Sequence, residues 1–124
     1  DNISPTVLTN NITVYLDASG AASITTADID NGSSDNCSIT TLVLDITSFD
    51  CNDVGTNTVS LTATDANSNS SSATTVVTVI DNISPTVLTN NVTVYLDASG
   101  AASITTADID NSSSDNCSIT LSLD

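Results

Sequence analysis

The chain has 124 residues and a formal net charge of −15, because all of its charged side chains are Asp and it contains no Lys, Arg or His. Side chains therefore cannot form salt bridges with one another, and a basic patch for nucleic acid or for an anionic membrane surface is excluded. We expect no nucleic-acid partner and no membrane insertion. We also expect no enzyme and no catalytic residues, since His, Lys and Glu, the usual general bases near neutral pH, are missing.

Hydrophobic residues make up 39% of the chain and alternate with polar ones, which favours a packed fold of strands over the disorder common in acidic chains. We predict strands where apolar residues recur at every second place: 12–16, from 22 onward, 42–46, 57–65 and 73–80. Ile46 is expected to face inward with Leu42 and Leu44, and Val43 to face solvent. Residues 27–38, rich in Asp, Asn and Ser, are predicted to form a long loop, and no helix is expected.

A long internal repeat sets the domain organisation. Residues 1–40 recur as residues 81–120, at an offset of 80 residues (81 − 1). The two copies differ only at Ile12/Val92 and Gly32/Ser112. We expect residues 1–80 to form one complete domain and residues 81–124 the N-terminal part of the next, near-identical one, in a longer array. Six or seven short strands in about 80 residues predict an all-β fold of tandem immunoglobulin-like β-sandwich repeats.

A domain of this size buries little apolar surface, so additional cross-links are expected to stabilise it. Cys37 and Cys51 can close a loop of about 15 residues, and we predict that they form a disulfide in an oxidising compartment. Cys117 repeats Cys37, and its partner would then lie beyond Asp124. The alternative is three free, buried thiols.

The acidic loops indicate a structural cation. In an immunoglobulin-like sandwich, the loops around residues 27–38 and 65–69 lie at the end where the chain enters, and carboxylates gathered there repel one another unless a cation intervenes. Ca²⁺, which takes six to eight oxygen ligands, is therefore predicted near the repeat junctions. The predicted ligands are Asp1, Asp28, Asp30, Asp35, Asp65, Asn67, Asp81, Asn82, Asp108, Asp110 and Asp115. The local pattern is not an EF-hand, because Gly32 and Ile39 occupy ligand positions of that loop. The alternative is that these residues are solvated turn-formers.

Three runs of sequence resemble a known family: residues 35–38 (Asp-Asn-Cys-Ser), 49–59 (Phe…Val-Gly-Thr-Asn-Thr-Val) and 61–69 (Leu-Thr-Ala-Thr-Asp…Asn). They are similar to hyalin-repeat (HYR-type) immunoglobulin-like modules, most closely the tandem copies in giant cell-surface adhesins of gliding Bacteroidetes. The resemblance covers the whole repeat, although Ser68 stands where the family usually has Gly. It implies export by a dedicated secretion system, a role in adhesion or gliding motility, and no catalytic residues.

The sequence thus predicts a structural stalk or filament repeat of a secreted, extracellular cell-surface adhesin, stiffened within each repeat by a disulfide and between repeats by Ca²⁺. The expected partners are neighbouring repeats of the same chain and identical chains in a fibre, with an external surface or polysaccharide contacted by other parts of the protein. One alternative is a surface- or polysaccharide-binding module, for which Tyr15 and Tyr95 are the aromatic candidates. A flat ice- or mineral-binding face on residues 58–64 and a spacer of a multidomain secreted enzyme are the others.

Overall fold

The computed structural model describes all 124 residues, and the chain divides into two compact units, Asp1–Asn82 and Ile83–Asp124. The strands all belong to the first unit: β1 (Ile12–Tyr15), β2 (Ala22–Ser23), β3 (Ile39–Leu44), β4 (Ser48–Phe49), β5 (Gly55–Asp65) and β6 (Ser70–Ile80). The helices are single turns: α1 (Thr26–Ile29), the 3₁₀ helix η1 (Cys51–Asp53) and, in the second unit, α2 (Thr106–Ile109). The fold is therefore all-β, as predicted. No helix is long and apolar enough to cross a membrane.

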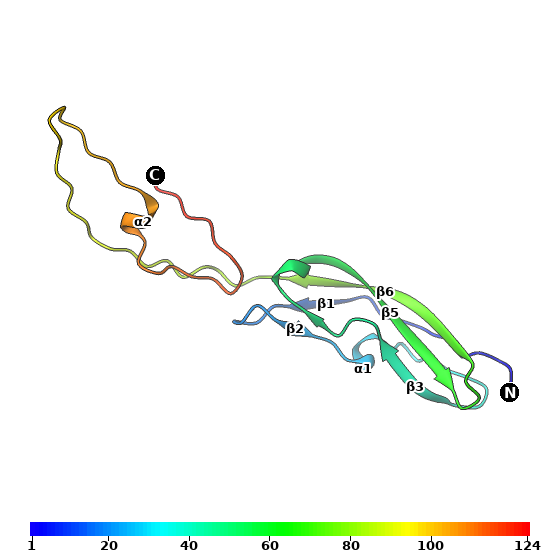
Figure 1. Cartoon of the computed structure of the whole chain (residues 1–124). Coiled ribbons are helices and arrows are strands. Elements are labelled where there is room, and N and C mark those ends of the chain that lie inside the picture. The colour runs from blue at the N-terminus through cyan, green and yellow to red at the C-terminus, as the bar shows by residue number, and fades with distance from the viewer. The chain divides into compact units, whose positions relative to one another are not determined.

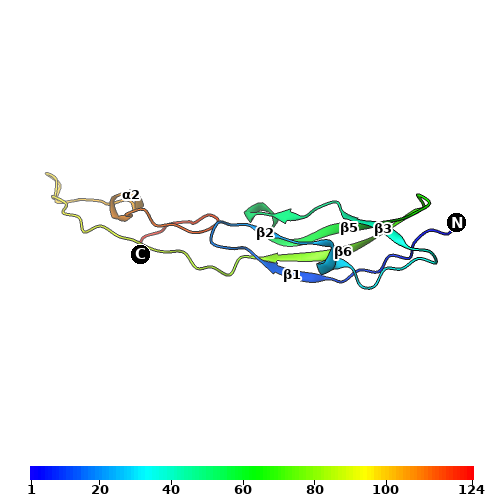
Figure 2. The same cartoon turned by 90° about the horizontal axis from the view of Figure 1, so that it is seen from below.

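The strands of the first unit form two sheets, which can be followed in Figures 1 and 2. The larger sheet has the order β1-β6-β5-β3, and the smaller one pairs β2 with β4. The long hairpin β5–β6 is antiparallel, as is the pair β3–β5, whereas the N-terminal strand β1 lies parallel to the last strand β6. The first and last strands of the unit are thus direct neighbours in one sheet.

Period-two alternation explains the core. On β5, Val59, Leu61 and Ala63 are fully buried, while the polar residues between them are half-buried. On β6, Val77 and Val79 are buried in the same way. The core is completed by further apolar residues at most 7% exposed: Leu16, Ile24, Ile29, Leu44 and Phe49. Alternation in the sequence therefore predicted β5 and the face that it buries, and it predicted the part of β6 from residue 73 onward.

Two local expectations were wrong. Residues 27–29 of the predicted loop 27–38 belong to helix α1. The helix starts with a capping box, in which the Asp28 carboxylate accepts the Thr25 N–H at 2.8 Å. Ile46, expected to face inward, is 38% exposed, although Val43 faces solvent as predicted. The reason is that β3 ends at Leu44. The Asp45 N–H still donates to the Ser60 carbonyl at 3.2 Å, but the Ser60 N–H donates to the Asp45 carboxylate at 2.8 Å and not to a backbone carbonyl. The alternation stops there.

The chain enters and leaves the first unit at opposite ends of the larger sheet. Asn69, in the turn between β5 and β6, donates a hydrogen bond from Nδ2 to the Asp1 carbonyl at 3.3 Å, so the N-terminus lies beside this turn (Figure 1). The chain leaves at Ile80, where β6 pairs with Tyr15 of β1 and with the start of β5. The eleven residues of β5 separate these two ends by roughly 35 Å.

The second unit keeps the turns of the first but not its strands. Helix α2 and the bridges Thr86↔Ser114 and Thr89↔Asp110 reproduce α1 and the bridges Thr6↔Ser34 and Thr9↔Asp30. Residues 92–95 do not pair, and Leu96 is 71% exposed, whereas its counterpart Leu16 is 2% exposed. Residues 83–124 include no counterparts of β5 and β6, the strands against which β1 and β3 of the first unit pair. An open hollow of about 80 Å³ between apolar residues such as Leu88, Ile109 and Leu121 marks the incomplete core.

Candidate functional site

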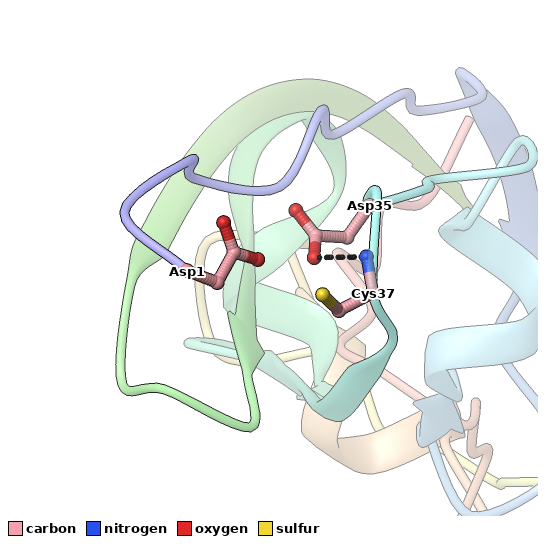
Figure 3. A group of neighbouring side chains, drawn as sticks. All are labelled: Asp1, Asp35 and Cys37. Atoms are coloured by element: carbon pink, nitrogen blue, oxygen red, sulfur yellow. Dashed lines mark hydrogen bonds between the residues drawn. The ribbon is translucent and has the colours of Figure 1, made fainter.

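Three potential metal ligands meet at the end where the chain enters the first unit. One ligand atom from each of Asp1, Asp35 and Cys37 lies within 4.8 Å of the other two. Figure 3 shows both carboxylates and the thiol converging, Asp1 from the entering segment and the other two from the loop before β3. The Asp35 carboxylate is oriented by the Cys37 N–H, which donates to Oδ2 at 3.0 Å. Of the predicted ligands, Asp1 and Asp35 are thus brought together.

The second carboxylate oxygen of Asp35 is the unusual atom of this cluster. Oδ1 is buried and accepts no hydrogen bond from the protein. The same holds for Oδ1 of Asp115 in the second unit, where the Cys117 N–H again donates to Oδ2, at 3.1 Å. Buried carboxylate oxygens normally have a partner, because leaving a charged acceptor unsatisfied is costly. A cation that prefers oxygen ligands, bound at each of these two places, would give the Oδ1 atom there a partner.

Asp65 lies at the same end of the unit, but its carboxylate already has protein donors. It is 3% exposed, Oδ1 accepts the N–H groups of Asn67 and Asn69 at 2.8 Å each, and Oδ2 accepts the Asn69 side chain at 2.7 Å. The Asn69 side chain, together with these backbone N–H groups, holds the pKa of Asp65 below its usual value although burial opposes this. Asp65 therefore closes the β5–β6 turn and is not positioned as a free ligand. Asn67 is exposed in that turn.

Asp28 and Asp30 lie farther along the unit, beside α1. Asp28 accepts its capping hydrogen bonds from Thr25, and Asp30 pairs with Thr9, eight residues after Asp1. Hydrogen bonds from the side chain and backbone of Ser33 lower the pKa of Asp30. The structure does not bring these two residues to the Asp1–Asp35 cluster.

The predicted ligands of the second copy follow the same division. Asp108 caps α2 as Asp28 caps α1, and hydrogen bonds from Ser113 lower the pKa of Asp110 as Ser33 lowers that of Asp30. Asp81 is half-buried and Asn82 is exposed. Asp28, Asp30, Asp65, Asp108 and Asp110 therefore act as local hydrogen-bond acceptors in turns and caps, whereas Asp35 and Asp115 each keep one buried oxygen without a hydrogen bond.

Sequence reasoning did not identify Asn69 and Asn11 as organising residues. Asn69 joins the Asp65 carboxylate to the entering chain at Asp1. Asn11 Oδ1 accepts the Val76 N–H at 3.0 Å and holds the entering chain against β6 just before β1 starts. The sequence feature that could have identified them is their position directly before a strand. There an Asn side chain can take the place of a backbone hydrogen-bond partner.

The predicted disulfide between Cys37 and Cys51 is absent. Cys37 is a free, exposed thiol, whereas Cys51 and Cys117 are disulfide-bonded. Cys51 lies in η1 at the exit end, where its Sγ is 3.9 Å from the Gly20 carbonyl, and Cys37 lies at the entry end beside Asp1. The two are separated by roughly the length of β5, about 30 Å, while a disulfide needs Cα atoms within about 7 Å.

The chemistry of the cluster depends on the state of its cysteine. The free thiol of Cys37 is a soft ligand that Ca²⁺ does not use, so Ca²⁺ would be held at this cluster by the carboxylate oxygens of Asp1 and Asp35.

Among known proteins no family model, curated sequence or solved structure matches this chain.

Proposed function

We propose that the chain is a structural stalk repeat of a large secreted cell-surface adhesin, built from tandem immunoglobulin-like sandwiches of the HYR type. Entry and exit at opposite ends of the unit carry this proposal. A module of this kind adds its full sheet length to an array each time the sequence recurs, which occurs after 80 residues (81 − 1). A chain that entered and left at one end would add little length.

The cysteines support an extracellular location. Disulfides persist in oxidising compartments and are rare in the reducing cytosol, and Cys51 and Cys117 are disulfide-bonded. The net charge of −15, with no cationic side chain to offset it, makes neighbouring copies repel one another and so favours an extended array. The proposal assigns the chain no catalytic step.

The solvent face of the β5–β6 hairpin favours a spacer over a binding module. Apart from Val76, which is 39% exposed, this face carries Ser and Thr residues. They pair across the hairpin: the hydroxyls of Thr62 and Ser72 lie 2.7 Å apart, and those of Thr64 and Ser70 lie 2.8 Å apart. Hydroxyls that satisfy one another offer few donors to a ligand. Tyr15, 56% exposed on the edge strand β1, is the one aromatic of the first unit that a glycan could stack on.

Calcium at the entry end of each repeat is the second part of the proposal. It rests on the buried, unpartnered Oδ1 atoms of Asp35 and Asp115 and on the nearness of Asp1 to Asp35. One module supplies too few ligands for a complete shell of six to eight oxygens, so water and backbone carbonyls would complete it. The ion would neutralise part of the local negative charge.

The stalk is tested by measuring length. Concatemers of two, four and eight copies of residues 1–80 should lengthen in small-angle scattering and electron microscopy by a constant increment of about 35–40 Å per repeat. Compact particles whose size grows only slowly with repeat number would contradict the proposal. Retention of the concatemers on polysaccharide or mineral surfaces would favour the binding module.

Calcium is tested separately by titration. Ca²⁺ should bind this chain and raise its melting temperature, and EDTA should reverse both effects. Asp35→Asn and Asp115→Asn should each remove one binding event in calorimetry. Asp97→Asn removes the same charge in the turn 97–101, which contains none of the predicted ligands, and should leave the stoichiometry unchanged. Equal loss in all three variants would indicate a general charge effect and no site.

A further inference from the structure

We propose that Asn31 is a site of spontaneous deamidation, and that the isoaspartate formed there releases the entering chain from the loop that holds it. Asn31-Gly32 is the one Asn-Gly sequence in the chain. Both residues are exposed, and the Asn31 side chain makes none of the hydrogen bonds of this loop. Its amide is therefore accessible to water and can turn toward the backbone nitrogen that follows it.

Asn is one of the chemically labile residues, and the reaction needs only water. The Gly32 nitrogen attacks Cγ of Asn31. A bond forms between these two atoms, the Cγ–Nδ2 bond breaks, and Nδ2 leaves as ammonia with the former Gly32 amide proton. Water then opens the resulting cyclic imide at one of its two carbonyl carbons. Opening at Cγ gives Asp, and opening at the original backbone carbonyl gives isoaspartate.

Gly32 favours this attack because it places no Cβ beside the nitrogen. It adopts φ +78°, and the space where a Cβ would lie is empty out to 4 Å. Closing the imide ring requires the backbone angles of the loop to change. Glycine permits such a change at low steric cost, and the open surroundings do not oppose it.

The second unit contains the same loop with a serine in place of this glycine. The Asn111 N–H donates to the Leu88 carbonyl at 2.9 Å, as the Asn31 N–H donates to the Leu8 carbonyl at 2.9 Å. Ser112 adopts φ +64°, so the backbone keeps the left-handed conformation of the first copy. The main local difference is the serine side chain beside the attacking nitrogen. Asn111 is therefore a matched comparison within the same chain.

The loop holds the entering chain through hydrogen bonds on both sides of the reacting peptide bond. The Leu8 carbonyl accepts the Asn31 N–H at 2.9 Å from one side and the Ser33 hydroxyl at 3.3 Å from the other. In isoaspartate the main chain runs through Cβ and Cγ, which adds one carbon, about 1.5 Å of length, between these two donors. Both donors can then no longer reach the same carbonyl, and the entering chain is released.

Peptide mapping of the folded full chain follows the reaction. After incubation near neutral pH, a protease that cleaves before Asp, and not before isoaspartate, releases residues 30–34 and 110–114. Isoaspartate leaves 30–34 intact with the mass of the acid, whereas Asp allows a further cut to 31–34. We expect conversion at least about tenfold faster at Asn31 than at Asn111. Equal rates at the two sites, or conversion only in urea, would overturn the proposal.

Two exchanged variants isolate the effect of the following residue. Gly32→Ser should slow Asn31 to the rate of Asn111, and Ser112→Gly should accelerate Asn111 to the rate of Asn31. The loop already forms with serine in the second copy, and Ser112→Gly removes a positive φ from a non-glycine residue, so neither exchange should prevent folding. Unchanged rates in both variants would show that glycine is not the cause, and the proposal would fail.

Hydrogen exchange tests the release of the entering chain. Thr6 and Ser34 exchange N–H···O=C bonds at 2.8 and 2.9 Å across the loop. In the isoaspartate form, both amides should exchange about tenfold faster, as expected when one or two hydrogen bonds are lost, while Leu61 in β5 stays protected. Freshly purified Asn31→Asp carries the same added charge on a normal backbone and should retain slow exchange. Equal exchange in these two forms would refute the release. None of these readouts depends on the stalk or on calcium.

Discussion

Ile29 and Ile109 offer a direct measurement of what the complete sheet contributes to stability. Both end a one-turn helix of the same sequence, Thr-Ala-Asp-Ile, but Ile29 is fully buried and Ile109 is only half-buried beside an open hollow. Replacing a buried Ile with Ala costs about 2–5 kcal/mol, through lost apolar burial and the cavity left behind. Ile109→Ala makes the same change of side chain and helix propensity outside the complete core, so it serves as the matched control for Ile29→Ala.

We expect Ile29→Ala to destabilise the first unit by about 3 kcal/mol, which corresponds to a fall in melting temperature of about 12–24 °C for a domain of this size. Ile109→Ala should change it by less than about 1 kcal/mol. Far-UV circular dichroism during urea titration reports the first unit, since all strands belong to it. Similar losses in both variants, or a loss below about 1 kcal/mol at Ile29, would refute the assignment of Ile29 to the core.

Three further predictions follow from local features. The pKa of Asp65 is lowered in the fold, so its stabilisation is present above the unfolded value of about 3.9 and is lost as pH falls through the folded value. Asp65→Asn should therefore lower the urea midpoint at pH 7, and the difference from the unmodified chain should shrink as the pH is lowered below about 3.9; a constant difference would contradict this. Gly32 has φ +78° with open space around it, so Gly32→Ser should cost about 1 kcal/mol from backbone strain alone, while Ser112→Gly relieves the same strain in the second copy; a much larger loss in urea titration would indicate a clash. Appending a copy of residues 46–80 after Asp124 should protect the amides of residues 92–95 from hydrogen exchange, because β1 forms only against β6; unchanged exchange would show that more than the missing strands is needed.

The parts of the fold that could be predicted are those governed by local alternation. The long strands β5 and β6, with inward Val, Leu and Ala, follow from period-two hydrophobicity, and the turn between them follows from its Asp and Asn residues. Ser68 adopts φ +67° in this turn, the left-handed conformation that Gly usually supplies. Sequence therefore located the turn, although it left its type undetermined.

The parts that could not be predicted depend on where the chain travels between strands. The path from β4 through η1 carries Cys51 to the exit end, and no spacing rule contains that information. The same applies to the predicted calcium ligands: Asp28 and Asp30 are close to Asp35 in sequence, but the extended segment after α1 separates them from it. The alternative interpretation, that these residues form turns, needs only short-range patterns, whereas the grouping of distant carboxylates depends on the fold.

The parallel pairing of β1 with β6 determines how the module would respond to a pull along its length. Tension applied at the two ends draws β1 and β6 in opposite directions along their shared axis. The backbone bonds between residues 12–15 and 77–80 would then be loaded in shear, all at once, and could not be opened one after another from an end. The Leu16–Ile80 and Asn11–Val76 hydrogen bonds extend this row on either side. Resistance to force in this unit therefore depends on one short row of hydrogen bonds, where a single Pro in β1 would weaken the module mechanically.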